Sequence, residues 1–265
     1  MTHRFELVRL PAPPPDVSAP APSDALASSA VDAGEHTEEL AVLAAPALLR
    51  LLQLTSPALP IGGFAFSQGL ESAHELGFIP DEASARAWLE GTLAEGMARL
   101  DLPVLKRLRA AFLRGDEAAA AYWTSYLLAS RESEERRLED QQVGRALSRL
   151  LSDQGVPGAE AWLRNETVTH ACQFALAAAH FQVPEGATLL GFAFSWAENQ
   201  VGALSRLMPL GQLASQRVLA AVGHAVPSAV RFAREVPDQS LGSTLPGLAI
   251  ASALHESQYS RLFKS

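Results

Sequence analysis

The chain has 265 residues, 48% of them apolar, and alanine and leucine supply much of that share, which favours helix over strand. The formal net charge of −8 argues against nucleic acid as a partner, because binding phosphate requires a basic face. The single cysteine, Cys172, excludes an internal disulfide and any multi-cysteine metal site. Its alanine-rich surroundings predict a buried thiol, not a nucleophile.

Residues 1–46 are predicted to form a disordered, proline-rich, acidic leader outside the folded domain. They contain seven of the seventeen prolines, and two arginines stand against seven carboxylates. A segment of this composition buries too little apolar surface to offset the entropy lost on ordering. A polyproline ligand for another module is the alternative. The folded domain is therefore expected to span residues 47–265.

No basic region followed by an apolar run marks a signal peptide at the start of the sequence. No uninterrupted apolar stretch reaches about 18 residues, the length that a membrane-spanning helix needs. We therefore expect a soluble, cytoplasmic protein with no membrane partner.

From residue 47 onward the apolar residues recur at helical spacing, and no segment alternates in the manner of a strand. The predicted fold is all-α: a single-domain bundle of roughly eight to ten helices without internal repeats. The expected helices cover residues 47–55, 67–76, 81–100, 101–115, 116–152, 157–181, 185–207 and 210–235, with a last one from 245. Pro227 is expected to kink or break the helix over 210–235, and Asp101 is expected to act as a helix cap before Pro103.

The expected helix over 116–152 contains a charged stretch, RESEERRLED, at residues 131–140. On a helix, Arg131–Glu135 and Glu132–Arg136 would be opposite-charge pairs one turn apart, each worth about 0.3–0.5 kcal/mol when exposed. One interpretation is a solvated helix segment. The other is an arginine–glutamate network that holds a partner or positions the C-terminal tail.

Local motifs give little support for catalysis. Gly62 and Gly63 lack the following GK[ST] of a phosphate-binding loop, and no serine lies in a nucleophile elbow. Glu71 and His74 have the Glu-x-x-His spacing of di-iron bundles, but the second such pair and the additional carboxylates are missing. A helical metalloenzyme that uses Glu71 and His74 stays open as an alternative.

The last eleven residues, HESQYSRLFKS, are unusual for a chain end. Tyr259, Leu262 and Phe263 would form an apolar stripe if the segment were helical, and Arg261 and Lys264 lie beside them. Aromatic residues mixed with arginine are enriched at the centres of protein–protein interfaces. A last helix packed on its own core is the alternative, and in either case we expect this terminus to be held in place.

The block SPALPIGGFAFSQGLESA at residues 56–73 resembles the urease accessory protein family UreF. Three further blocks agree in order: residues 129–147, residues 196–219 and the terminal HESQYSRLFKS, with its specific ending SRLFKS. Together they cover most of the chain after residue 47. The family often ends in RLFRS, so Lys264 keeps the charge but not the bidentate geometry of arginine.

The resemblance implies a non-enzymatic, all-helical, homodimeric maturation factor without a cofactor. Such a protein bridges a scaffold protein (UreD, also called UreH) and the GTPase UreG while nickel is delivered to the urease apoprotein, and it modulates the GTPase. A generic helical interaction module unrelated to urease is a further alternative. For Arg261, docking is favoured over an arginine finger that acts on the GTPase.

The resemblance also implies which residues take part. The tail would become ordered on the scaffold protein, and its partner-binding residues would be Tyr259, Arg261, Leu262, Phe263 and Lys264. The loop beside the tail and its supporting network would consist of Pro57, Pro60, Gly62, Gly63, Phe64, Glu71, Arg131 and Glu132. Within this network, Glu71 and Arg131 would satisfy polar groups of the tail.

Overall fold

The computed structural model describes residues 44–265, so almost all of the predicted leader lies outside the described residues. The described part contains eleven α-helices and no strand, which confirms the all-α prediction. The helices are α2 (Ala45–Thr55), α3 (Leu70–Glu75), α4 (Glu82–Thr92), α5 (Asp101–Arg114), α6 (Glu117–Ala129), α7 (Glu134–Asp153), α8 (Ala159–Leu163), α9 (His170–His180), α10 (Glu185–Leu207), α11 (Gln212–Glu235) and α12 (Pro246–His255). No helix of this part is long and apolar enough to cross a membrane.

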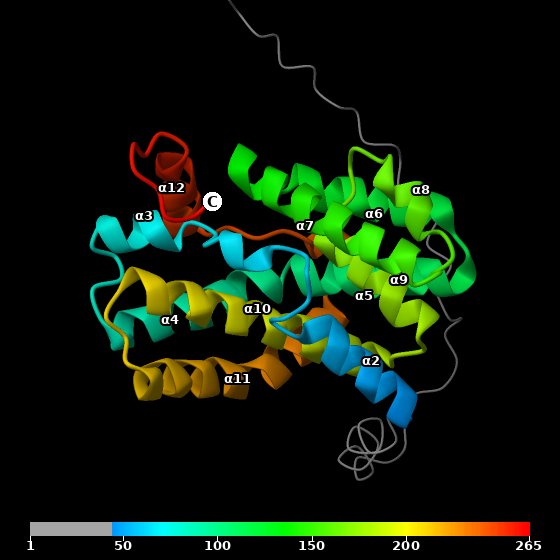
Figure 1. Ribbon diagram of the computed structural model, residues 1–265, viewed down its shortest axis with the longest axis horizontal. Helices are drawn as coiled ribbons and strands as arrows, with labels where there is room; N and C mark the ends of the chain where they lie inside the picture. The colour runs from blue at the N-terminus through cyan, green and yellow to red at the C-terminus, as the bar shows by residue number, and fades with distance from the viewer. Residues whose placement is uncertain (1–43) are drawn as a thin grey trace, which may run out of the picture.

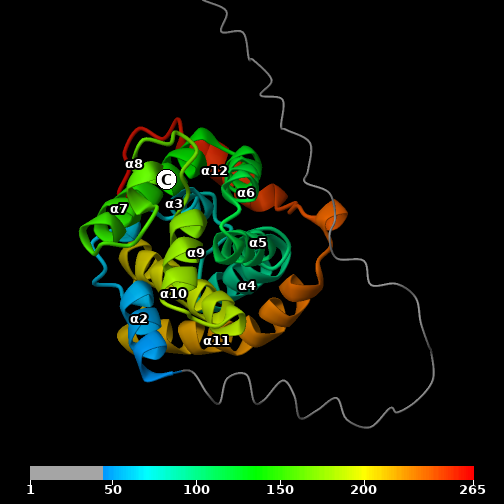
Figure 2. The same cartoon turned by 90° about the vertical axis from the view of Figure 1, so that its right-hand side faces the viewer.

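The helices pack around α5, which lies at the centre of the end-on view (Figure 2). Helix α5 contacts α6, α9, α10 and α11, and the core leucines on it, Leu102, Leu105 and Leu108, have no exposed surface. Helices α10 and α11 run side by side along one edge of the bundle, and α7 packs on α9 at the other (Figure 1). Burial of these apolar faces is the main force that holds the bundle together.

Local signals fix several helix ends. Asp81 and Ser84 form a reciprocal capping box at the start of α4, and Asp116 caps α6 through the Ala119 amide. Gly115 adopts a left-handed conformation, with φ +67°, directly after α5. Asp101 does not act as the predicted cap, because Leu100 occupies the N-cap position and the Asp101 carboxylate binds Arg131 instead.

The helix expected over 67–76 begins only at Leu70, because the backbone turns sharply just before it. Gln68 and Gly69 both adopt left-handed conformations, with φ +57° and +79°. A Cβ atom on Gly69 would lie 3.2 Å from the backbone nitrogen of Ser252, so glycine permits α12 to approach closely. The turn brings Ser67 and Gln68 into the interior instead of onto a helix face.

The helix expected over 116–152 is two helices. Helix α6 ends at Ala129, and α7 restarts at Glu134 after Ser133, whose hydroxyl accepts a hydrogen bond from the Arg136 amide. The segment over 157–181 is likewise split, since α9 begins only at His170 with Thr169 as its cap. The two predicted continuous helices were therefore wrong.

Pro227 neither ends nor interrupts α11, which continues to Glu235. A proline inside a helix costs about 3 kcal/mol. Its neighbours Val226, Ala229 and Val230 are buried in the core, and their packing outweighs that cost.

Candidate functional site

The residues after α12 form a tail, residues 256–265, that folds back beside α3 and toward the start of α7 (Figure 1). The tail is irregular and not helical, so the condition under which Tyr259, Leu262 and Phe263 would form an apolar stripe is not met. The amides of Leu262, Phe263 and Lys264 bond to carboxylate and carbonyl oxygens of other segments, and only the first turn, at Ser257 and Gln258, still bonds to carbonyls three residues earlier. Phe263 is buried, whereas Tyr259 and Leu262 face solvent.

Glu71 on α3 holds the tail backbone. One carboxylate oxygen accepts a hydrogen bond from the Leu262 amide at 2.7 Å, and the other accepts from the Phe263 amide at 2.8 Å. The Glu71 carboxylate is buried, and hydrogen bonds to a buried charge are stronger than those between neutral groups. Glu71 therefore satisfies two polar backbone groups of the tail.

Glu135 on α7 holds the tail from the other side. Its Oε1 pairs with Nη1 of Arg261 at 2.5 Å, and its Oε2 lies 2.6 Å from Nδ1 of His255. The other ring nitrogen of His255, Nε2, lies 3.2 Å from Oε2 of Glu71. We call Glu71, Glu135 and His255 the clasp, because they join α3, α7 and α12 and hold the tail among them.

Further contacts fix the end of the tail. The amide and hydroxyl of Ser67 both donate to the carbonyl oxygen of Ser265, and the Lys264 amide donates to the Ala65 carbonyl at 2.9 Å. The Phe263 ring is 4% exposed, and the guanidinium of Arg206 lies 4.2 Å from its centre. The tail is thus anchored through its backbone and one aromatic side chain.

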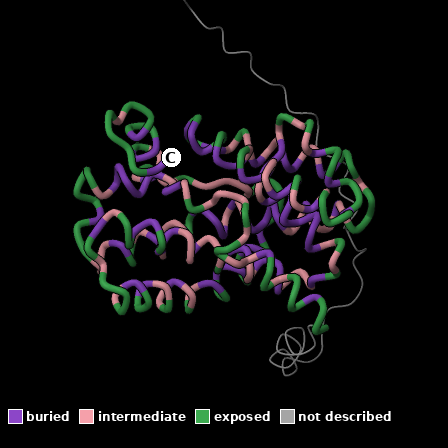
Figure 3. The backbone as a smooth tube through the Cα atoms, viewed as in Figure 1, coloured by how far each residue is buried: buried purple, intermediate pink, exposed green. Residues whose placement is uncertain are grey.

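The outward side of this region presents several large apolar side chains among polar ones. Tyr259 is fully exposed, Leu262 is 60% exposed, and Ile250 and Leu254 on α12 are about half exposed. The turn after α12 is accordingly coloured as exposed in Figure 3. A rigidly held segment that presents large apolar side chains to solvent is typical of an interaction surface.

The loop over residues 56–66 lies beside the end of the tail. Gly62 has φ +76°, a conformation that favours glycine, and Phe64 is 66% exposed. The link to the tail is made by backbone groups: Ala65 binds the Lys264 amide, and Arg206 donates to the Phe64 carbonyl. Pro57 and Pro60 are exposed and, like Gly63, have no side-chain group that could hydrogen-bond to the tail.

The charged stretch over 131–140 is not a solvated helix face. Arg131 pairs with Asp101 and Asp140, each at 2.6 Å, and all three side chains are nearly buried. Burial alone would raise the pKa of Asp101, but the charge and hydrogen bond of Arg131 outweigh it and hold that pKa below its usual value. The predicted Arg131–Glu135 and Glu132–Arg136 pairs do not form, because residues 131–133 precede α7.

Arg131 therefore ties α5 to α7 and does not contact the tail, contrary to what the resemblance implied. Glu132 is exposed and lines the cavity described next. Of the predicted supporting residues, the structure brings Glu71 to the tail and leaves Arg131 and Glu132 apart from it.

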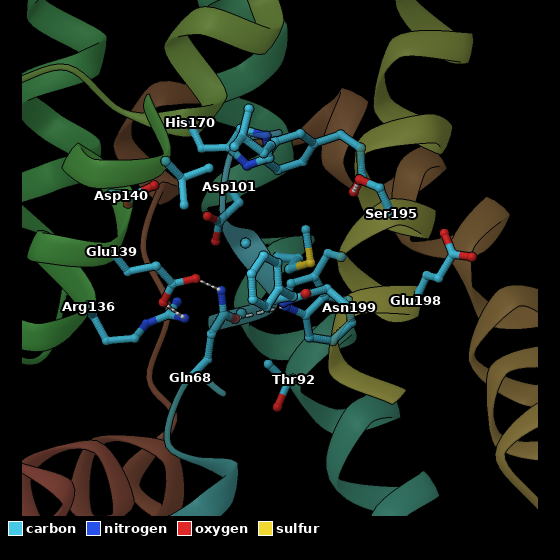
Figure 4. Close-up of a pocket in the computed structure, with 18 of the residues that line it drawn as sticks. Gln68, Thr92, Asp101, Arg136, Glu139, Asp140, His170, Ser195, Glu198 and Asn199 are labelled. Atoms are coloured by element: carbon cyan, nitrogen blue, oxygen red, sulfur yellow. Dashed lines mark hydrogen bonds and ion pairs between the residues drawn. The ribbon is translucent and has the colours of Figure 1, made fainter. Parts of the chain in front are cut away.

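A cavity of about 300 Å³ lies between the 56–66 loop, α7 and α10 (Figure 4). Gln68 crosses it: its Nε2 donates to Oε1 of Glu139 at 2.6 Å, and its Oε1 accepts from Nε1 of Trp196 at 2.9 Å. Glu139 also accepts from the Ser265 hydroxyl, so the cavity wall and the tail share one carboxylate. Sequence reasoning did not single out Gln68, although it lies within the block at residues 56–73 that carries the resemblance.

Two buried groups at the cavity wall have hydrogen-bonding capacity to spare. Nε and Nη1 of Arg136 and Nε2 of His170 have no hydrogen-bond partner among the described residues, although Nη1 of Arg136 lies 3.7 Å from Glu139. Burial lowers the pKa of His170 to about 4, so its ring is neutral at pH 7. Burial also raises the pKa of Glu139, against the opposing effects of Arg136 and Gln68.

Glu71 and His74 do not converge on a shared ligand position. Glu71 faces the tail, whereas Nδ1 of His74 lies 2.7 Å from the carbonyl oxygen of Ile79. Within residues 44–265, no group of three or more histidine, cysteine or acidic side chains is placed to hold a metal ion. Cys172 is buried, and burial raises the pKa of its thiol to about 12, as expected for a structural cysteine.

Fold and site together define an all-helical protein whose C-terminal tail is held by buried carboxylates. The UreF family model matches residues 79–223. Three relatives named urease accessory protein UreF each match 83% of this chain. The protein of Chromohalobacter salexigens is 49% identical, with 95% of its own length matched, and that of Marinobacter nauticus is 46% identical, with 94% matched. The protein of Hahella chejuensis is 42% identical, with 98% of its length matched. The chain belongs to the UreF family of urease accessory proteins, which implies a role in urease maturation.

Proposed function

We propose that this protein is a non-catalytic scaffold of urease maturation that bridges a UreD/UreH-type scaffold protein and a UreG-type GTPase during nickel insertion. Family membership supports the maturation role. The observation that carries the bridging role is the tail: its backbone is held by the clasp, while Tyr259 and Leu262 are presented to solvent.

This arrangement suits binding because the tail loses its conformational entropy when the chain folds, before the partner binds. A disordered segment that folds on its partner spends part of the interaction energy on ordering. Here Glu71 already fixes the tail backbone and Glu135 holds the Arg261 side chain, so apolar contacts by Tyr259 and Leu262 count more fully toward affinity. Ile250 and Leu254 extend the same exposed surface onto α12. We assign this surface to the UreD/UreH-type partner.

Arg261 has a docking role in this proposal. Its guanidinium is paired with Glu135, so it fixes the tail and is not free to reach into another protein's active site. The protein would then modulate the GTPase through differential affinity for its states, without supplying a catalytic group. We place this assembly in the cytoplasm, with a homodimer of this chain at its centre and the urease apoprotein as its target.

The test is co-expression with the cognate UreD-type and UreG-type proteins, followed by size-exclusion chromatography with light scattering. Tyr259→Ala and Leu262→Ala together should abolish or weaken the complex at least tenfold while the helical content stays unchanged. Both side chains are exposed, so their removal should not unfold the chain.

Leu213→Ala is the matched control, because Leu213 is 78% exposed but lies on α11, away from the tail. The control variant should assemble as the unmodified chain does. Equal assembly of the double variant and the control would remove the tail from the interface. Failure of every chain to associate would argue against the bridging role itself. GTP turnover by the UreG-type protein, measured with and without Arg261→Ala, separates docking from an arginine finger.

A further inference from the structure

The cavity between the 56–66 loop, α7 and α10 has the size and the lining of a small-molecule pocket. Its volume of about 300 Å³ falls at the lower end of the range for such pockets, which is about 300–1,000 Å³. Met97, Phe192 and Leu248 supply buried apolar surface to the wall, and Trp196 adds a partly exposed indole ring. An apolar wall with a few polar groups is the usual composition of a ligand site.

Arg136 is the polar group on this wall that lacks a partner. Its side chain points from α7 toward the cavity beside Gln68 (Figure 4), and the residue is only 9% exposed. Nε and Nη1 have no hydrogen-bond partner among the described residues. Nη1 lies 3.7 Å from Oε2 of Glu139, beyond the length of about 2.7–2.9 Å of a charged hydrogen bond. A buried guanidinium with unused N–H groups calls for an acceptor in the cavity.

The charges around the cavity favour an uncharged acceptor. Arg131 faces two carboxylates, those of Asp101 and Asp140. Arg136 faces Glu139, so two positive charges stand against three negative ones in this part of the wall. A carboxylate or phosphate ligand would add to the negative excess, and an ammonium group would bring N–H donors to a guanidinium that needs an acceptor. A carbonyl or amide oxygen accepts from Arg136 without adding charge.

His170 offers a second polar contact at another point of the wall (Figure 4). Its Nε2 is buried and has no hydrogen-bond partner among residues 44–265. Burial lowers the pKa of His170 to about 4, so the ring is neutral at pH 7, and Nε2 donates or accepts according to the tautomer. The ring centre lies 5.1 Å from that of Phe192, which places this polar atom at the border of the apolar wall. A neutral imidazole also suits an uncharged ligand.

Part of the wall is a π-helical turn, Leu93–Met97, directly after α4. Such turns are rare and occur frequently at functional sites. Within the turn, a Cβ atom on Gly96 would lie 2.8 Å from Cδ1 of Leu245, so the absence of a side chain lets Leu245 pack against the turn. Gly96, Met97 and Leu245 all line the cavity, and the irregular turn therefore contributes to its shape.

We propose that this cavity is a binding site for a small uncharged molecule with an apolar body and a carbonyl- or amide-type oxygen, and that Arg136 donates to this oxygen. Met97 and Phe192 contact the apolar body. Water can also accept from Arg136, but it gains nothing from the apolar wall, whereas an apolar body is transferred out of water. The inference goes beyond the scaffold role and does not depend on it.

The experiment is an NMR titration of the full chain at pH 7 with three probes of similar size. Benzamide is uncharged and carries an amide oxygen, benzoate is an anion, and benzylamine is a cation at this pH. The indole N–H of Trp196, assigned with Trp196→Phe, reports on the cavity because Trp196 lines it and donates to Gln68. Benzamide should shift this signal saturably. It should bind about tenfold more tightly than either charged probe, the factor expected for one mismatched hydrogen bond.

Gly202→Leu blocks the site without removing a hydrogen-bonding group. Gly202 lies on α10 and lines the cavity, and a Cβ atom there would meet nothing within 4 Å, so the new side chain enters open space. Gly186→Leu is the matched control, because Gly186 lies on the same helix, also in open space, but away from the cavity wall. Benzamide binding should be lost in the first variant and unchanged in the second. Arg136→Lys keeps the charge but not the planar fork, and it should weaken benzamide binding about tenfold.

Saturable benzamide binding that Gly202→Leu removes and Gly186→Leu keeps would support the site. Benzoate or benzylamine binding as tightly as benzamide would overturn the assignment of an uncharged ligand. The absence of a saturable shift with every probe, as expected of a cavity that holds water only, would overturn the site itself. Benzamide binding that persists in Gly202→Leu would overturn it too, because the probe would then lie elsewhere. The unmodified chain and Gly202→Leu decide these outcomes, so a folding defect in Arg136→Lys does not remove the test.

Discussion

Glu71→Gln is the most direct test of how the tail is held. Glutamine has nearly the same size and shape, but it is neutral and keeps only one acceptor oxygen. Glu71 accepts two tail amides, from Leu262 and Phe263, and glutamine can satisfy only one of them. The other amide would face the NH₂ group of glutamine, donor against donor.

The magnitude follows from these bonds. A hydrogen bond to a charged group contributes about 1.5–3 kcal/mol, whereas one between neutral groups contributes about 1 kcal/mol. Replacing two of the first kind by one of the second costs about 3 kcal/mol before the tail relaxes. At about 1.4 kcal/mol per factor of ten, the opening constant of the tail should rise on the order of 100-fold.

The assay is hydrogen exchange of the tail amides at fixed pH, together with assembly on the UreD-type protein. Glu160→Gln is the matched control, because Glu160 is an exposed residue of α8 whose ion-pair partner among the described residues is Arg164, one turn along the chain and not in the tail. A loss of tail protection below about fivefold in Glu71→Gln would refute the reasoning. It would mean that burial of Phe263 and the Ala65–Lys264 backbone bond hold the tail without the carboxylate.

Three further predictions concern the bundle. Gly144→Ala should lower the melting temperature by destabilising the fold by about 1–3 kcal/mol, because its Cβ would lie 2.7 Å from the backbone of Thr169; thermal unfolding checks this. The lowered pKa of Asp101 adds stability that is present above about pH 4 and is lost as the pH falls through the lowered value. The free energy of unfolding should therefore fall more steeply on acidification in the unmodified chain than in Asp101→Asn, and equal slopes would contradict it. The Cys172 thiol, with a pKa of about 12, should react with a thiol reagent such as DTNB only on unfolding; rapid reaction in the native state would show that it is accessible.

The parts of the fold that the sequence predicted best are those with strong local signals. The predicted ranges 185–207 and 210–235 agree closely with α10, Glu185–Leu207, and α11, Gln212–Glu235. A proline stands just before α10, and another stands between the two helices at residue 209. Each helix also carries a continuous apolar face, so its ends and its buried side are encoded within its own residues.

The break between α6 and α7 could not be predicted in this way. Residues 130–133 contain neither glycine nor proline, and their charges suit a continuous helix. The helix ends there because Arg131 forms ion pairs with Asp101, thirty residues earlier, and with Asp140 on the other side of the break. Two buried ion pairs of this kind outweigh the weak helix preference of a few residues.

The contacts of the tail were even less predictable from the local sequence than this break between helices. Sequence spacing suggested a helical stripe in the tail and a Glu71–His74 pair on α3, and neither forms. The partners of Glu71 are instead the amides of Leu262 and Phe263, which lie 191 and 192 positions further along the chain. The resemblance pointed to Glu71, but no local pattern could reveal that His255 lies between it and Glu135, because that contact exists only once three helices have packed.

The contacts that hold the tail come from residues far away in the sequence, and their chemistry explains why the tail can be held and still be released. A tail that packed through apolar side chains alone would be released only by unfolding part of the core. Here Phe263 supplies one buried anchor, and most of the remaining contacts are polar bonds to Glu71, Glu135 and Ser67 at the edge of the bundle. Such bonds are strong while the buried carboxylates keep their partners and weak once a partner is removed, so the chemistry of the clasp, more than the fold, sets how firmly the tail is presented to a partner.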